Sequence, residues 1–283
     1  ETPCAGFTTG TTTATSTAYT FPADNTTYTF SAKAIDRSGN QSPFATKIIE
    51  YIQRPVIINE IAWAGTASAS SQDEWIELFN PTSHTIDLSN IRLTSHSDSK
   101  PNIALSGTIP PGGYYIIERT DDTTISDIAA GMIASFGAGS GAGLSNSGEM
   151  LALEYHGAIL DQTPEIQTCG GWCGGYAEGG YPTMERIDSH TSGTEKTNWM
   201  TWIGYPKNGK TADRTTNING TPGKRNSADY LIDPSVSMLT KDKTLTKAKN
   251  PYIIMADFTI PSEKTLTVEA GTVIKFLEGG ISL

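Results

Sequence analysis

The stretch from Val56 to Leu93, VIINEIAWAGTASASSQDEWIELFNPTSHTIDLSNIRL, is the part of the sequence that most constrains the fold. It contains two runs of strand-forming residues, VIINEIAW and EWIELFN, which are joined by a loop of small residues and followed by TIDLSNIRL. Within EWIELFN, the side chains of Trp75, Glu77 and Phe79 fall on one face, because successive side chains of a strand point to opposite sides. The stretch therefore predicts successive strands of an antiparallel sheet.

The composition favours an all-β protein. Thr, Ser and Gly are abundant, and no long apolar stripe repeats every 3.6 residues. One short helix is nevertheless predicted, because Ile125, Ile128, Ala129 and Met132 fall at helical spacing behind Thr and Ser residues that could cap it. We expect this helix to end at or just after Gly131.

The charge is concentrated in the middle of the chain. The net charge is -10, and residues 56–230 hold 20 acidic and 10 basic side chains. A negative field repels phosphate backbones, so we expect no nucleic-acid partner. The locally basic residues 207–225 are interpreted first as solvated loop charge and second as an anion-binding strip. No apolar run approaches the roughly 20 residues of a membrane span, so we expect no transmembrane segment.

Several motifs follow one another in a characteristic order. They are NEI, DEWIELFNPT, IDLSN, SGTIPPGGYYII, GLSNSGEMLALEYHGAILDQ and NINGTPGKRNS. This series resembles a bacterial lamin tail domain. The resemblance implies an immunoglobulin-like β-sandwich over residues 55–229. It indicates the fold and the kind of protein in which such a domain occurs, and it implies no particular reaction.

The two flanking regions resemble parts of other β modules. Residues 1–54 contain two alternating runs around the turn Asp36–Asn40, which resemble the C-terminal part of a fibronectin type III or immunoglobulin-like module. Residues 230–283 include TLTVEAGTVIKF and resemble the first coils of a parallel β-helix, with Ile260, Leu266, Val268, Val273 and Ile274 expected to point inward. We expect the chain to be part of a longer multidomain protein.

Four carboxylates lie near the second predicted strand and could form a calcium site. They are Glu60, Asp73, Glu74 and Glu77. Calcium takes six to eight oxygen ligands, and carbonyl groups of residues 68–72 could add to the carboxylates. The alternative is that Asp73 and Glu74 are ordinary charges that discourage edge pairing between sheets. No other cofactor is expected. Asp121, Asp122 and Asp127 are a second candidate cation site. They are more simply explained as acids at the N-terminus of the predicted helix, where the helix dipole favours them.

The irregular segment 163–185 holds the other candidate site residues. Its Cys169 and Cys173 lack the spacing and partners of a zinc site. They either form a small disulfide that fixes a glycine-rich loop or remain two free or separately buried thiols. Cys4 has no evident partner. We assign Trp63 and Trp75 to the core, whereas Trp172 and Tyr176 could form a platform for a ligand such as a sugar ring.

No catalytic constellation is recognisable. The histidines His84, His96, His156 and His190 fall in predicted turns or loops, and none accompanies a GxSxG or HExxH motif. The glycine-rich residues 137–143 lack the flanking strand and helix of a phosphate-binding loop, so we expect a flexible hairpin crossing there.

These observations predict a non-catalytic interaction or scaffold module of an exported bacterial surface protein, located outside the cell. Its partners would be surface proteins or glycans. The alternative is an accessory region of a secreted hydrolase or polysaccharide lyase whose active site lies outside these residues. Structural work of the nuclear-lamina type is disfavoured, because no heptad coiled coil accompanies the domain.

Overall fold

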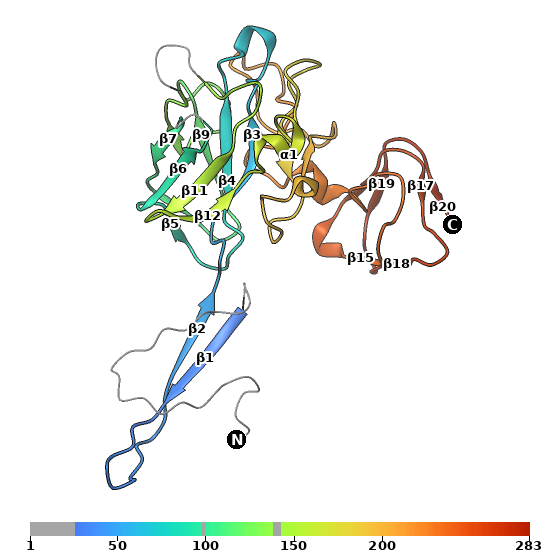
Figure 1. Cartoon of the computed structure of the whole chain (residues 1–283). Coiled ribbons are helices and arrows are strands. Elements are labelled where there is room, and N and C mark those ends of the chain that lie inside the picture. Colours follow the sequence, from blue (N-terminus) through green and yellow to red (C-terminus); the bar gives the residue numbers. More distant parts are fainter. Residues whose placement is uncertain (1–25, 98–99, 138–142) are drawn as a thin grey trace. The chain divides into compact units, whose positions relative to one another are not determined.

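The computed structural model describes residues 26–97, 100–137 and 143–283 and divides the chain into two units, Glu1–Gln53 and Arg54–Leu283 (Figure 1). The boundary between the units falls at the short linker that precedes Val56. The expectation for Cys4 lies outside the described residues, as do residues 138–142 of the hairpin crossing expected at residues 137–143.

The first unit contains an antiparallel hairpin of β1 (Thr26–Ala32) and β2 (Ala45–Tyr51), as the alternating sequence predicts. Asp36 shapes the turn between them, because its carboxylate accepts the N–H groups of Ser38 and Asn40 at 2.8 and 2.9 Å. This is the side-chain chemistry by which Asp favours turns.

The second unit is built around two sheets that pack face to face (Figure 1). The larger sheet has the strand order β10 (Met132–Ile133), β9 (Tyr114–Glu118), β4 (Trp75–Phe79), β3 (Ile57–Ala62), β13 (Met184–Arg186) and β14 (Trp199–Thr201). The smaller sheet has the order β12 (Ala158–Gln162), β11 (Leu151–Tyr155), β6 (Ile91–Ser95) and β7 (Asn102–Ala104). A separate small pair joins β5 (Ile86–Asp87) to β8 (Thr108–Ile109). The predicted all-β fold and β-sandwich are confirmed.

The main core lies between the two sheets and contains Ile76 and Leu78 from β4 together with Leu93, Leu151 and Leu153 from the smaller sheet. The opposite face of β4 is also covered. There Trp75 packs with Ile116, Ile125 and Ile218 in a second apolar cluster. The alternation in EWIELFN is therefore correct, but both faces of this strand are buried.

The helix predicted at residues 125–131 is wrong, because residues 121–128 form turns and bends instead. The carboxylates of Asp121 and Asp122 accept the N–H groups of Thr123 and Ala130 at 2.9 and 2.7 Å. The bond from Ala130 occupies an amide that the predicted helix would use for an intrahelical bond, which is how Asp competes with helical structure. Asp121 and Asp122 are therefore turn residues and not helix N-terminal acids.

Only short helical turns occur among the described residues. They are η1 (Ser68–Ser70), α1 (Ile166–Cys169), η2 (Lys196–Asn198), η3 (Ser227–Tyr230) and η4 (Lys247–Lys249). In that part of the chain, no helix has the length and apolar character needed to cross a membrane.

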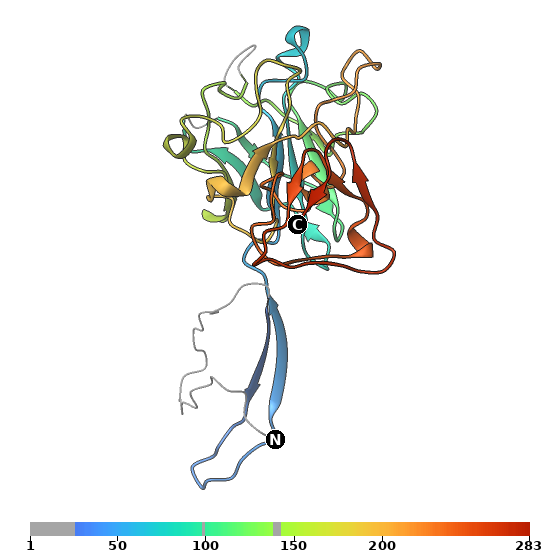
Figure 2. The ribbon, with the colours of Figure 1, turned by 90° about the vertical axis from the view of Figure 1, so that its right-hand side faces the viewer.

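Residues after 230 form stacked turns of chain joined by parallel strand pairs, and Figure 2 looks onto these turns. The pairs are β15 (Lys243–Leu245) with β18 (Leu266–Val268), β16 (Tyr252–Ile254) with β19 (Ile274–Phe276), and β17 (Phe258–Thr259) with β20 (Ile281–Ser282). Leu245, Tyr252 and Phe258 are among the buried residues of a third apolar cluster. The description of this region as a β-helix stays a prediction.

The inward residues of the stacked turns were predicted only in part. Ile260, Leu266 and Ile274 pack against the third cluster. Val268 pairs in register with the buried Leu245 and lies on the same face of β18 as Leu266, although it is 48% exposed. Val273 precedes the packed Ile274 and is 45% exposed, so its predicted inward position is wrong. Both residues lie on the outer turn of the stack.

A buried ion pair joins the two sheets. The carboxylate of Asp161 on β12 accepts hydrogen bonds from both terminal nitrogens of Arg186 on β13, at 2.5 and 3.1 Å. Both side chains are 1% exposed. The backbone N–H of Ile58 on β3 also donates to Asp161 at 3.0 Å. One carboxylate therefore connects the smaller sheet to two strands of the larger one.

We expect Asp161→Ala to lower the free energy of unfolding by about 3–5 kcal/mol, because Arg186 would then be a buried charge without its partner. Urea denaturation of the whole chain measures this change, with the exposed Glu178→Ala as the control. The double variant Asp161→Leu/Arg186→Met should recover part of the loss. A single variant as stable as the control would contradict this role for the pair.

Candidate functional site

Three buried glutamates form a row across neighbouring strands of the larger sheet. Glu77 on β4 lies opposite Glu60 on β3, and Glu60 lies opposite Glu185 on β13. All three are fully buried. A register shift in β3 between Ile58 and Glu60 accompanies this alignment. We call these three residues the glutamate row.

The residues that cover the row come from far along the chain. Thr183 Oγ1 and the backbone N–H of Thr221 donate to Glu60 Oε1 at 2.6 and 2.8 Å. The N–H of Ser227 donates to Glu185 at 2.9 Å, and the Ser227 hydroxyl donates to the same oxygen. We call residues 218–228 the closing segment. Its backbone and hydroxyl groups thus supply most of the donors for these two carboxyl groups.

Glu77 is held in the same way at the other end of the row. Its carboxyl group accepts hydrogen bonds from Asn59 Nδ2 at 2.8 Å and from the backbone N–H of Gly223 at 2.5 Å. Asn59 is in turn hydrogen-bonded to Asn226, with 2.8 Å between Asn59 Nδ2 and Asn226 Oδ1. At Gly220, a Cβ atom would lie 2.5 Å from Glu60 Oε1. The absence of a side chain there lets the closing segment approach the row.

The geometry around Thr221 requires a proton on the row. Its hydroxyl oxygen lies 3.0 Å from Glu60 Oε2 and 2.7 Å from Glu185 Oε1. A hydroxyl group has one proton and can donate to one of these oxygens at a time. The other contact becomes a hydrogen bond only when that carboxyl group is protonated and donates to Thr221.

The electrostatics of the row point in the same direction. Burial, followed by the charge of the neighbouring Glu77, raises the pKa of Glu60 to about 8. Burial also raises the pKa of Glu77 to about 8, against the hydrogen bonds from Gly223 and Asn59. For Glu185, burial followed by the charge of Glu60 raises the pKa to about 8. The row therefore holds protons at neutral pH, because a buried carboxyl group disfavours its charged form.

The structure places the four predicted calcium ligands in two groups. Glu60 and Glu77 belong to the glutamate row. Glu74 lies 3.2 Å from Arg119 and accepts the N–H of Leu144 at 2.9 Å, and burial raises its pKa to about 7. Asp73 is half-buried, and burial raises its pKa. In residues 26–97, 100–137 and 143–283, no three His, Cys, Asp or Glu side chains are grouped as metal ligands.

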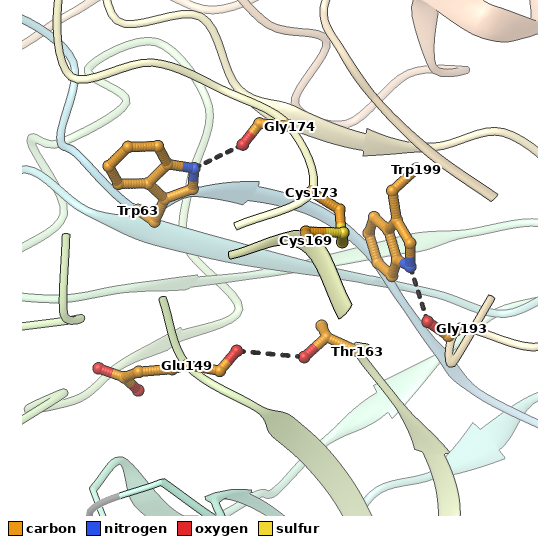
Figure 3. The surroundings of a disulfide bond; sticks show 8 residues. All are labelled: Trp63, Glu149, Thr163, Cys169, Cys173, Gly174, Gly193 and Trp199. Carbon is orange, nitrogen blue, oxygen red and sulfur yellow. Dashed lines mark hydrogen bonds between the residues drawn. A yellow bond between two sulfur atoms is a disulfide. The ribbon is translucent and has the colours of Figure 1, made fainter. Parts of the chain in front are cut away.

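The second candidate region is the loop that follows α1, where the structure joins Cys169 and Cys173 in a disulfide (Figure 3). The indole N–H of Trp63 donates to the carbonyl of Gly174 at 2.8 Å. At Gly175, a Cβ atom would lie 2.6 Å from that indole nitrogen. The disulfide and the indole bond together hold the loop against the sandwich.

The two predicted ligand-binding aromatics differ in exposure. The Trp172 ring stacks on Trp63, with 6.0 Å between centroids and 9° between planes, and its N–H donates to the carbonyl of Ser145 at 2.8 Å. Trp172 is thus half-buried against the core. Tyr176 is 62% exposed. A shared platform for a ligand stays a prediction, with Tyr176 as its more accessible member.

The histidines offer no catalytic arrangement among the described residues. All four lie in turns or bends, and His96 forms a hydrogen bond of 2.6 Å with Glu154. The sequence did not single out Glu185 or the donors of the closing segment. The motif NINGTPGKRNS marked this segment only as part of the lamin tail resemblance. Spacing along the chain does not reveal its contacts with Glu60 and Glu77, which lie more than 140 positions away.

Comparison with known proteins places a lamin tail domain at residues 52–166, where the family model of that name matches the chain. A crystal structure of a DUF4876 family protein from Bacteroides thetaiotaomicron VPI-5482 is also similar, with 12% sequence identity and a TM-score of 0.34. That match covers 62% of this chain and 79% of the other. No curated protein matches the sequence. The larger sheet continues past the family match with β13 and β14.

We expect the unfolding free energy to fall as the pH rises from about 4.5 to about 8. In this range the folded row keeps protons that the unfolded chain, with its ordinary glutamate pKa of 4.5, has released. The folded state then binds more protons, so raising the pH favours unfolding. Urea midpoints at several pH values measure the slope.

Glu60→Gln should flatten this pH dependence, whereas the exposed Glu178→Gln should leave it unchanged. A stability that rises through the same pH range in the unsubstituted chain would contradict a protonated row.

The disulfide determines how Cys169 and Cys173 should react with an alkylating reagent. After denaturation without reductant, Cys169 and Cys173 should resist alkylation, and both should react after reduction. Mass spectrometry of the peptides measures the labelling. Labelling of both residues before reduction would exclude the bond.

Calcium binding stays a prediction from the sequence and has a direct test. A cation held by Glu60, Asp73, Glu74 or Glu77 should raise the melting temperature of the chain at millimolar calcium, because a ligand that binds the folded state stabilises it. Magnesium serves as the control cation. An unchanged melting temperature would exclude the site.

Proposed function

We propose that this chain, which carries a lamin tail domain at residues 52–166, serves as a non-catalytic interaction module of an exported bacterial multidomain surface protein. Its partners would be proteins or glycans at the cell surface. The proposal rests on three features of the chain. They are the glutamate row, whose carboxyl groups are hydrogen-bonded inside the fold, the disulfide, and the exposed ring of Tyr176.

The glutamate row carries the proposal. Active sites often contain buried carboxyl groups with raised pKa values, so this cluster is the natural place to look for catalysis. Here, however, the row is fully buried, and its oxygens accept hydrogen bonds from Thr183, the closing segment and Asn59. A substrate could reach these oxygens only by displacing that segment. The row is therefore best explained as the structural attachment of the closing segment to the sheet.

The disulfide supports export, because such bonds persist in oxidising compartments and are rare in the cytosol. Tyr176, whose ring is largely exposed, follows three residues after Cys173 in the same glycine-rich loop. Aromatic rings offer large contact areas to proteins and sugars. The loop is thus the surface on which we expect the module to contact its partner.

A second candidate function is an accessory region of a secreted hydrolase or polysaccharide lyase. The parallel strand pairs after residue 230 favour it, because they are consistent with the first coils of a parallel β-helix. In that case the active site would lie on other residues of the parent protein. The chain would position or target that enzyme.

A glycan array and a set of surface proteins, probed with the purified chain, test the proposal. We expect binding that Tyr176→Ala weakens about tenfold, as expected for loss of an aromatic contact of about 1.4 kcal/mol. Tyr155→Ala is the matched control, since Tyr155 is also an exposed aromatic, on β11. Turnover of a polysaccharide in proportion to the concentration of the purified chain would contradict a non-catalytic role.

A further inference from the structure

A cavity of about 500 Å³ lies between the closing segment and the first of the stacked C-terminal turns. Its lining combines the ends of β4 and β9 in the sandwich with β15 and η4 in those turns. Ligand pockets usually have volumes of about 300–1,000 Å³, so this cavity has room for a small molecule or one part of a polymer.

Arg186, which is paired with Asp161, lines the cavity together with four further cationic side chains, namely Arg225, Lys241, Lys243 and Lys249. Among the described residues, none of these four has a carboxylate within the 4.0 Å of an ion pair, since the pairs there involve His96, Arg119 and Arg186. Four unpaired cations in one cavity are notable in a chain with a net charge of -10. They are available to an anionic ligand.

Arg225 is held in place at the edge of this group. Its terminal nitrogens donate to the carbonyls of Lys249 and Asn250, both at 3.3 Å. Its guanidinium also lies 4.3 Å from the centre of the Tyr230 ring. These contacts orient the guanidinium without neutralising its charge.

The cavity also contains acceptors and one apolar wall. Asp188, Asp229 and Asp233 line it, and none of the three lies in an ion pair with a described residue. Asp233 already accepts hydrogen bonds from Ser235 and Thr240, which leaves Asp188 and Asp229 as the acceptors considered for a ligand. Phe79 and Tyr114 lie side by side at the ends of their strands, with 5.0 Å between ring centroids. The Tyr114 hydroxyl has no hydrogen-bond partner among the described residues, so it can donate to a ligand.

We propose that this cavity binds a carboxylate-bearing carbohydrate, such as a uronic acid unit of an acidic polysaccharide. The lysines and Arg225 would bind the carboxylate, Asp188 and Asp229 would accept sugar hydroxyl groups, and the Phe79–Tyr114 wall would face the apolar side of the ring. This inference rests on the proposed function, because it names a ligand class for the interaction module.

The mixed lining argues against other ligand classes. A neutral apolar molecule would leave four cations without partners. Inorganic phosphate is too small to contact both the lysines and the aromatic wall of a cavity of this volume. An acidic peptide would satisfy the cations and could donate backbone N–H groups to Asp188 and Asp229, so a peptide is tested directly as a comparison ligand.

Calorimetric titration of the whole chain with trigalacturonic acid tests the inference, with galactotriose, triglutamate and inorganic phosphate as comparison ligands. We expect trigalacturonic acid to bind at least about tenfold more tightly than each of these, which corresponds to about 1.4 kcal/mol. Binding should weaken as the salt concentration rises.

Two sets of variants locate the site. Lys241→Gln/Lys249→Gln should weaken binding of trigalacturonic acid about tenfold or more; both side chains are exposed, so the fold should tolerate the change. Lys47→Gln/Lys275→Gln removes the same charge from exposed positions outside the cavity lining and should leave binding unchanged. Tyr114→Phe should also weaken binding.

The outcomes separate this inference from the proposed function. No heat of binding with trigalacturonic acid or triglucuronic acid would overturn the inference, as would equal affinity for triglutamate or equal effects of the two lysine pairs. Glycan binding that depends on Tyr176 but not on Lys241 and Lys249 would overturn the proposal that the cavity is the binding site. The proposed function as an interaction module would remain. Cleavage of trigalacturonic acid would overturn the non-catalytic function and leave the cavity as its binding site.

Discussion

Three carboxyl groups, those of Glu60, Glu77 and Glu185, lie side by side inside this protein, and the surrounding structure depends on how they are satisfied. A buried carboxyl group costs free energy unless it is hydrogen-bonded or protonated. Here both solutions occur, because the closing segment supplies backbone and hydroxyl donors and the pKa values are raised to about 8. The row thus attaches residues that lie more than 140 positions apart in the chain.

The attachment of the closing segment determines how the outer face of the larger sheet is covered and where the C-terminal turns begin. The closing segment covers the outer face of the larger sheet, and Ile218 joins Trp75 in the second apolar cluster there. Its end, at η3, leads into the stacked C-terminal turns. The cavity that holds Arg225 and the three lysines lies where these two parts meet. The proposed ligand site is therefore a consequence of how the closing segment is held.

The predicted site residues show which features local sequence patterns can predict and which they cannot. The spacing of Cys169 and Cys173 left a disulfide and free thiols as alternatives, and only the path of the loop, which turns at Gly170, decides between them. The predicted helix at residues 125–131 followed from apolar spacing, but Asp121 and Asp122 bind local amides and the segment forms turns. Trp172 looked accessible in its glycine-rich loop, yet it stacks on Trp63.

The sequence alone determined the all-β class, the strands from Ile57 to Phe79 and the lamin tail resemblance, because alternation and turn residues act over a few positions. Only the tertiary structure decided that both faces of β4 are buried, that Glu185 joins Glu60 and Glu77, and that the cations of residues 225–249 share one cavity with the distant Phe79 and Tyr114. The physical reason is that each of these features depends on strand order and on long-range hydrogen bonds. Neither is encoded in the spacing of neighbouring residues.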